Sequence, residues 1–289
     1  PYYKPVDLPI SLICISRFLD KEGYPIKIIA ENLYPDPFQV IRESAKESLV
    51  LGISAMTGLQ IQGGLKASKI AKEANKDIKI IWGGWHPSVH PLQVLENPYI
   101  DIVIKGQGAR ALYDVVKRIE KGENYKDIPG VYWKENGEIF TNPDRNLESI
   151  DDWPPLPYHL VDIDKCVMVT EFGSRTINYV SSYGCPYRCS FCSEVTVNHR
   201  SWVGLSPELV LDEIRQETQA LKKSFNNPRR TVIHDAELAD QTDESFIPHE
   251  DAIITLSQKG YVKRVPSDTF RTQHRGGKGV VGMRTREDD

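Results

Sequence analysis

Three things are scarce in this sequence: cysteine, long apolar runs and net charge. Only 5 of the 289 residues are cysteines, and the formal net charge is -4. No apolar run approaches the ~20 residues of a membrane-spanning helix, so we expect no membrane partner. The small net charge gives no general reason to expect nucleic acid as a partner. No charged and then apolar leader opens the chain, and sparse cysteine suits a reducing compartment, so we expect a cytoplasmic protein.

The few cysteines are unevenly distributed. Cys185, Cys189 and Cys192 share one short loop with the spacing C-x3-C-x2-C. Such a concentration in a cysteine-poor chain indicates metal or cluster ligation. Three thiolates can hold an iron–sulfur cluster that takes four ligands, which leaves one iron open. A structural zinc site with His199 as the fourth ligand is the alternative, although such sites usually close with a second cysteine pair, which this chain lacks.

This loop resembles the signature of the radical S-adenosylmethionine (SAM) superfamily, with an aromatic residue before the last cysteine. The resemblance implies that Cys185, Cys189 and Cys192 bind a [4Fe-4S] cluster and that SAM chelates the open iron beside Phe191 and Tyr187. It further implies that one electron from the cluster cleaves SAM to methionine and a 5′-deoxyadenosyl radical, which abstracts hydrogen from a small-molecule substrate. The sequence does not identify that substrate, and no catalytic residue is assigned.

The first part of the chain alternates between helical and strand patterns. Apolar periodicity predicts helices over 10–22, 38–47, 59–75 and 110–120, and strands over 26–29, 49–53, 78–82 and 100–104. Strands that alternate with helices favour parallel pairing with right-handed crossovers. We therefore predict an α/β fold with a flavodoxin-like, doubly wound parallel sheet, whose ligands bind beyond the carboxyl ends of the strands.

Two small-residue loops fall at those carboxyl ends. The first begins Ser54-Ala55-Met56-Thr57, and the second begins Gly83-Gly84-Trp85-His86. Together they resemble the second half of the cobalamin (B12)-binding domain pattern. The resemblance implies a cobalamin site lined by Ser54, Met56, Thr57, Gly83, Gly84 and His86. No histidine precedes His86, so nothing replaces the histidine that ligates cobalt in that family. The alternative is a plain flavodoxin-like domain whose two glycines form a tight turn.

The middle of the chain connects this domain to the cysteine loop. Asn136-Gly137 between two β-prone runs predicts a hairpin over 131–140. We place a cobalamin-binding-type domain at 1–141 and a proline-rich linker at 142–171. The N-terminal piece of a radical SAM (β/α) barrel then covers 172–212, with its first strand at 176–182. Ser206 and Pro207 begin a helix. Too few residues follow Cys192 for a complete barrel, so a truncated barrel start is expected.

The tail resembles a different family, the gyrase A protein, from about residue 212 to residue 289. The run Gln273-His274-Arg275-Gly276-Gly277-Lys278-Gly279 is similar to the gyrase box. A strand–turn–strand pattern over 259–264 has Gly260 at its turn. The resemblance implies a helix end and a partial β-blade over 213–289. It also implies a weak contact of the tail with DNA phosphates through Gln273, Arg275, Gly276, Gly277, Lys278 and Gly279. The alternative is a solvated basic face.

Three functional hypotheses follow. The first is a B12-domain radical SAM iron–sulfur protein with an impaired barrel. The second is a DNA-binding fragment of the gyrase A protein, which is part of a type IIA topoisomerase. The third is a non-catalytic chimeric fragment. Because the missing barrel would hold most of the SAM and substrate contacts, we do not expect turnover by this chain alone.

Overall fold

The computed structural model describes residues 7–171, 173–227 and 250–270. Contacts between residues divide the chain into two units, Pro1–Lys222 and Lys223–Asp289. Each unit is described by itself. Among the described residues, no helix is both long and apolar enough to cross a membrane.

The first unit contains a five-stranded sheet with the order β1-β2-β3-β4-β5. Its strands are β1 (Val50–Ser54), β2 (Lys79–Gly83), β3 (Ile102–Ile104), β4 (Val131–Glu135) and β5 (Glu138–Thr141). The first three strands are parallel neighbours, whereas β4 and β5 pair antiparallel. Asn136 and Gly137 both have positive φ, as a type I′ hairpin turn requires. The expected parallel sheet and the expected hairpin are therefore both confirmed.

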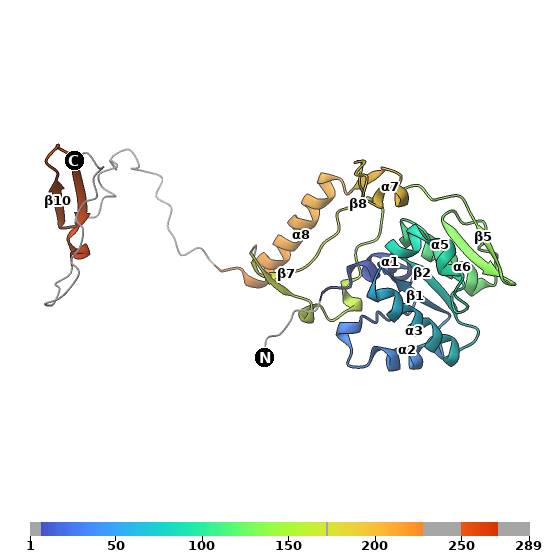
Figure 1. Ribbon diagram of the computed structural model, residues 1–289. Coiled ribbons are helices and arrows are strands. Elements are labelled where there is room, and N and C mark those ends of the chain that lie inside the picture. Colours follow the sequence, from blue (N-terminus) through green and yellow to red (C-terminus); the bar gives the residue numbers. More distant parts are fainter. Residues whose placement is uncertain (1–6, 172, 228–249, 271–289) are drawn as a thin grey trace. The chain divides into compact units, whose positions relative to one another are not determined.

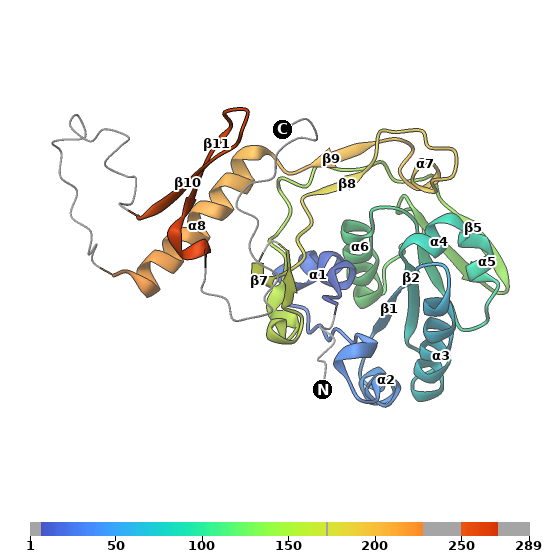
Figure 2. The ribbon, with the colours of Figure 1, turned by 60° about the vertical axis from the view of Figure 1, so that its left-hand side comes forward.

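Helices cover both faces of this sheet (Figures 1 and 2). They are α1 (Ile10–Lys21), α2 (Pro37–Ala45), α3 (Leu59–Ala74), α4 (Trp85–Val89), α5 (Pro91–Leu95) and α6 (Gly108–Lys121). Side chains from α1 and α6 pack with Ile81 of β2 on one face. Side chains from α2, α3 and α5 pack with its neighbours Ile80 and Trp82 on the other. This alternation of neighbouring residues is the pleat of a strand buried on both faces.

The strand predicted over 26–29 is wrong. In the structure this segment has no strand assignment and leads into a short 3-10 helix, Glu31–Leu33. Ile28 is buried in a cluster with Leu8, Ile13 and Cys166 instead. Pro25 removes a backbone donor just before the segment, which weakens it as a ladder strand. Its apolar residues are therefore buried by side-chain packing.

The segment that follows the α/β domain forms short antiparallel pairs. Two further 3-10 turns, Tyr158–Leu160 and Ile163–Lys165, precede β6 (Met168–Thr170) and β7 (Gly173–Thr176), which pair with each other. β8 (Ser182–Gly184) pairs with β9 (Trp202–Gly204), with α7 (Glu194–Val197) between them and α8 (Pro207–Phe225) after them. The start of α8 at Pro207 agrees with the predicted helix start.

The single barrel strand predicted over 176–182 is also wrong. Residues 177–181 are not in a strand, and β8 begins only at Ser182. A barrel strand needs parallel neighbours to satisfy its backbone, and β8 instead pairs antiparallel with β9 beyond the cysteine loop. The barrel start remains a prediction.

In the second unit the described residues form a two-stranded antiparallel hairpin. β10 (Ala252–Leu256) pairs with β11 (Val262–Pro266), and a 3-10 turn, Ser267–Thr269, follows. Gly260 has φ 88° at the connection, so the predicted strand–turn–strand is confirmed. A partial blade remains a prediction, and residues 273–279 lie outside the described residues.

Candidate functional site

The loops after β1 and β2 are joined by backbone hydrogen bonds at the carboxyl edge of the sheet. Ser54 lies opposite Gly83 in the parallel register. The N–H of Ala55 donates to the carbonyl of Gly83 at 3.0 Å, and the N–H of His86 donates to the carbonyl of Ala55 at 3.0 Å. The two predicted small-residue loops are therefore brought together into one edge.

Gly84 is the residue that makes this close approach possible. Its φ is +93°, a conformation that favours glycine. A Cβ at this position would lie 3.0 Å from both the backbone nitrogen and oxygen of Ala55 and 3.1 Å from Oγ of Ser54. The second glycine of the pair is thus required by backbone packing against the end of β1.

His86 lies beneath this edge and is buried. Its Nδ1 is 3.3 Å from Oγ1 of Thr57, and its ring centroid is 5.5 Å from that of His90. Burial, and then the nearby His90, lower the pKa of His86. These effects favour the neutral imidazole, which links the two loops through Thr57, while Met56, which is 55% exposed, faces solvent beside them.

The end of β3 completes the edge. The N–H of Gly106, whose φ is 77°, donates to Oγ of the buried Ser88 at 3.0 Å. Gln107 is buried, and its Oε1 accepts the N–H of Glu148 at 2.9 Å. An uncharged amide suits this role because a buried carboxylate would be costly there. Gln107 therefore ties the linker to the domain.

The cysteine loop connects β8 to β9. Cys185 is half-buried, whereas Cys189 and Cys192 are exposed. Phe191 is 91% exposed and Tyr187 is 72% exposed. Thiols are the right donors for an iron–sulfur cluster, but the described residues contain no group of three or more metal-binding side chains gathered around one point. The three thiols are therefore chemically suitable donors for a cluster, but the structure does not bring them together around one point.

His199 points to a carboxylate. Its Nε2 lies 2.8 Å from Oδ2 of Asp144, which also accepts from Nζ of Lys105 at 2.6 Å. The hydroxyl of Tyr132 donates to Oδ1 of Asp144 at 3.1 Å. Burial alone would raise the pKa of Asp144, but hydrogen bonds from Lys105, His199 and Tyr132 outweigh it and lower the pKa. His199 therefore fastens the cysteine segment (residues 182–204, from β8 to β9) to Asp144. This use of the imidazole does not support the zinc alternative.

The cysteine segment also packs against the carboxyl edge of the sheet. α7 contacts α4, the helix that follows the two glycines. Glu194 and Val197 of α7 are both buried. A Cβ on Gly106 would lie 3.8 Å from the carbonyl oxygen of Val197. Sequence reasoning missed this docking, and the signal for it was the pair of valines, Val195 and Val197, in an otherwise polar stretch.

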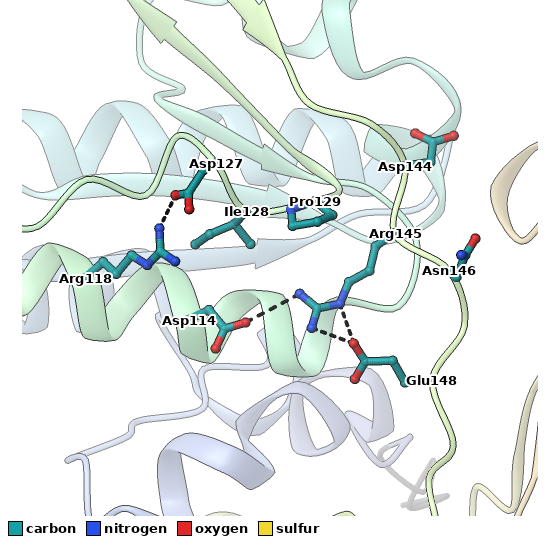
Figure 3. Close-up of a pocket in the computed structure, with 9 residues that line it drawn as sticks. All are labelled: Asp114, Arg118, Asp127, Ile128, Pro129, Asp144, Arg145, Asn146 and Glu148. Atoms are coloured by element: carbon teal, nitrogen blue, oxygen red, sulfur yellow. Dashed lines mark hydrogen bonds and ion pairs between the residues drawn. The ribbon is translucent and has the colours of Figure 1, made fainter.

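A cavity of about 450 Å³ lies elsewhere in the first unit. Figure 3 shows Arg145 turned toward Asp114 and Glu148, and Arg118 turned toward Asp127. Arg145 pairs with Asp114 at 3.5 Å and with Glu148 at 2.6 Å, and Arg118 pairs with Asp127. None of the sequence-predicted site residues lines it. Both of its arginines are already paired with carboxylates, so the carboxyl edge remains the candidate site.

Comparison with known families supports the resemblances to the B12-binding domain and to gyrase A. Residues 7–116 match the B12 binding domain, and residues 251–289 match the DNA gyrase C-terminal domain, beta-propeller. The chain thus carries a B12-binding domain followed, in a chimera-like arrangement, by a segment similar to part of gyrase A.

Individual relatives also match the two parts of the chain separately. An uncharacterized methyltransferase of Pyrococcus horikoshii is 32% identical over 213 residues, which are 71% of this chain and 45% of the relative. The DNA gyrase A protein of Streptococcus pyogenes serotype M3 is 45% identical over 83 residues, 29% of this chain and 10% of the relative. The chain therefore spans less than half the length of either relative.

A solved structure shares the fold of the larger part. It is the radical SAM methyltransferase TsrM from Kitasatospora setae, with cobalamin and a [4Fe-4S] cluster bound. The TM-score is 0.53 at 18% identity, over 75% of this chain and 44% of that chain. At this identity the likeness supports the fold alone.

Proposed function

We propose that this chain is the cofactor-binding part of a cobalamin-dependent radical SAM protein of the methyltransferase type. The observation that carries the proposal is the carboxyl edge, where Gly84 packs on Ser54 and Ala55 while the cysteine segment docks on the same edge through α7. One edge thus presents both the B12-type loops and the element that carries the three thiols.

For cobalamin, the residues present suit the group. Gly84 has no side chain to cover the backbone of the edge, and Ser54 is only half-buried. Met56 and Thr57 are exposed beside them. We propose that Ser54, Met56, Thr57, Gly83 and Gly84 contact the cofactor, while His86 holds the two loops together from beneath. Bound cobalamin supplies a carrier for a methyl group, and this chain offers no histidine before His86 to ligate its cobalt.

For the cluster, the proposal rests on donor chemistry. Cys185, Cys189 and Cys192 would supply the three thiolates, and a bound [4Fe-4S] cluster supplies single electrons for the reduction of SAM. The exposed rings of Tyr187 and Phe191 leave that side of the loop open to SAM. The structure does not gather the three thiols around one point. The substrate is a small molecule that the chain does not identify.

Equilibrium dialysis of the full chain against hydroxocobalamin tests the B12-type edge. We expect about one cobalamin per chain, and at least about tenfold weaker binding in Gly84→Ala, because the new methyl group must displace the end of β1. Gly137→Ala is the matched control, since Gly137 also has positive φ but open space around it. Equal binding by Gly84→Ala and Gly137→Ala, or none by the unmodified chain, would contradict this assignment.

A second candidate function belongs to the tail. The identity to gyrase A over 83 residues and the β10–β11 hairpin favour a weak contact of this segment with DNA. Arg275 and Lys278 are the proposed phosphate contacts. The full chain should retard duplex DNA at about 50 mM salt and release it by about 200 mM. A doubly substituted chain, Arg275→Ala with Lys278→Ala, should lose most of that retardation, and unchanged retardation would reject this role.

A further inference from the structure

One arginine of the α/β domain is buried on the same helix as the core residues Ile13 and Phe18. Arg17 is on α1, and only 8% of its surface is exposed. A buried guanidinium is costly unless its donors are used. Its surroundings therefore indicate what it holds in place.

The contacts of Arg17 converge on the turn that precedes the cysteine segment. Its Nε donates to the carbonyl oxygen of Pro154 at 2.5 Å. Its guanidinium lies over the ring of Trp153, with Cζ 5.4 Å from the ring centroid. Trp153 in turn packs edge-on against Phe18 of the same helix, at 5.3 Å between centroids. Arg17 thus fixes the Trp153-Pro154 turn against α1.

Tyr183 extends this cluster to the cysteine loop. Its ring is 5.8 Å from that of Trp153, and it packs on the apolar cluster around Phe18 and Trp153. Burial and then the nearby Cys14 raise the pKa of its hydroxyl, while the nearby Arg17 opposes that rise, so the hydroxyl lies close to both side chains. Tyr183 is the middle residue of β8, two positions before Cys185.

The backbone beyond Tyr183 has little freedom to compensate for a shift. Gly184 has φ +82°, and a Cβ there would lie only 2.1 Å from the carbonyl oxygen of Ser201 on the other side of the hairpin. A displacement of Tyr183 is therefore passed on to Cys185 and to the start of the loop.

We propose that Arg17 is a positioning residue for the cysteine loop, an inference that rests on the proposed function. Its buried guanidinium ties α1 and the Trp153-Pro154 turn to Tyr183, the point from which the loop departs. Arginine suits this role better than lysine, because one planar guanidinium can donate to a carbonyl while its face stacks on an indole ring.

The test uses the full chain with the substitutions Arg17→Met, Arg17→Lys and Tyr183→Phe. Arg175→Met is the matched control, because Arg175 is an exposed arginine paired with Asp164 at 3.1 Å.

Hydrogen exchange needs no cofactor and reports on the loop directly. In Arg17→Met we expect amide exchange over 182–187 to rise about tenfold, with α3 and β2 unchanged, since a lost hydrogen bond to a charged group is worth roughly that factor locally. Arg17→Lys should restore part of the protection, and Tyr183→Phe should reproduce part of the loss.

A second measurement separates positioning from overall stability. After anaerobic reconstitution, iron per folded chain and the EPR line shape of the reduced cluster should change in Arg17→Met and recover partly in Arg17→Lys. Unchanged exchange over 182–187 in Arg17→Met and Tyr183→Phe would overturn the proposal, and so would a rise that extends equally to α3 and β2. If the unmodified chain binds no iron, the proposed function fails, while the exchange result still decides whether Arg17 positions the loop.

Discussion

The α/β domain and the cysteine segment hold their shapes in different ways. The domain buries its own large side chains: Trp82 on β2 is 1% exposed, and its Nε1 donates to Oγ of Ser68 at 3.0 Å. The cysteine segment leaves Tyr187, Phe191 and Trp202 largely exposed. Its buried residues, Glu194 and Val197, lie on the one helix that packs against the domain.

This difference shows that the order of the cysteine segment depends on the domain. Tyr183 at its start and His199 at its end both contact residues outside the segment. A site that depends on such docking can be disturbed from the domain, whereas the domain should tolerate changes in the segment. The predictions below test that asymmetry.

The largest effect is expected in the domain core. Trp82→Ala should lower the free energy of unfolding by about 3–5 kcal/mol, because it removes a fully buried indole and leaves a cavity. Trp202→Ala in the cysteine segment should change it by less than about 0.5 kcal/mol, since Trp202 is 57% exposed. Denaturant unfolding followed by far-UV circular dichroism measures both. Similar losses in the two variants would remove the contrast between the regions.

A pair of adjacent glycines on α3 tests the same core more finely. A Cβ on Gly64 would lie 2.8 Å from the ring of Trp82, whereas a Cβ on Gly63 would meet nothing within 4 Å. Gly64→Ala should destabilise the domain by about 1–2 kcal/mol through overpacking. Gly63→Ala should stabilise it by about 0.5–1 kcal/mol through helix propensity. Thermal unfolding of both variants checks the opposite signs, and a shared sign would refute the packing described here.

A smaller, pH-dependent effect is expected where the cysteine segment meets Asp144. The pKa of Asp144 is lowered in the folded state, so its stabilising contribution is present above its ordinary value of 3.8 and is lost as pH falls through the folded value. Asp144→Asn should cost about 1–3 kcal/mol at pH 7 and progressively less below about pH 4.

Asp164→Asn is the control for that measurement, because the Asp164 side chain is 84% exposed and pairs with Arg175 at the surface. It should show little change at any pH. Urea unfolding at pH 7, 5 and 3 gives the profile. A cost of Asp144→Asn that is the same at pH 3 as at pH 7 would show that its charge is not used.

Much of the fold was predictable because local signals agreed with the tertiary structure. The apolar run that became β2 is buried on both faces, and Asn136-Gly137 dictates its own turn. The strand over 26–29 was wrong because side-chain packing around Ile28 took precedence over ladder pairing. The strand over 176–182 was wrong because antiparallel pairing with β9 determines where β8 lies.

The candidate site was likewise predictable only in part. Ser54 and Gly84 were predictable, because a close backbone approach requires a glycine at that point. The docking of α7 and the role of Arg17 were not, since each depends on a partner distant in the sequence. Arg17 shares α1 with serine, aspartate and lysine as well as apolar residues, so nothing in the sequence marks this arginine as buried. Whether the three cysteines bind a cluster remains a prediction.

Anaerobic reconstitution of the full chain with iron and sulfide tests the central claim most directly. We expect about four iron atoms per chain, and a reduced EPR signal that changes when SAM is added. The matched control is the chain in which Cys185, Cys189 and Cys192 are all replaced by alanine, which should bind none. Iron binding no greater than in that control would contradict the account.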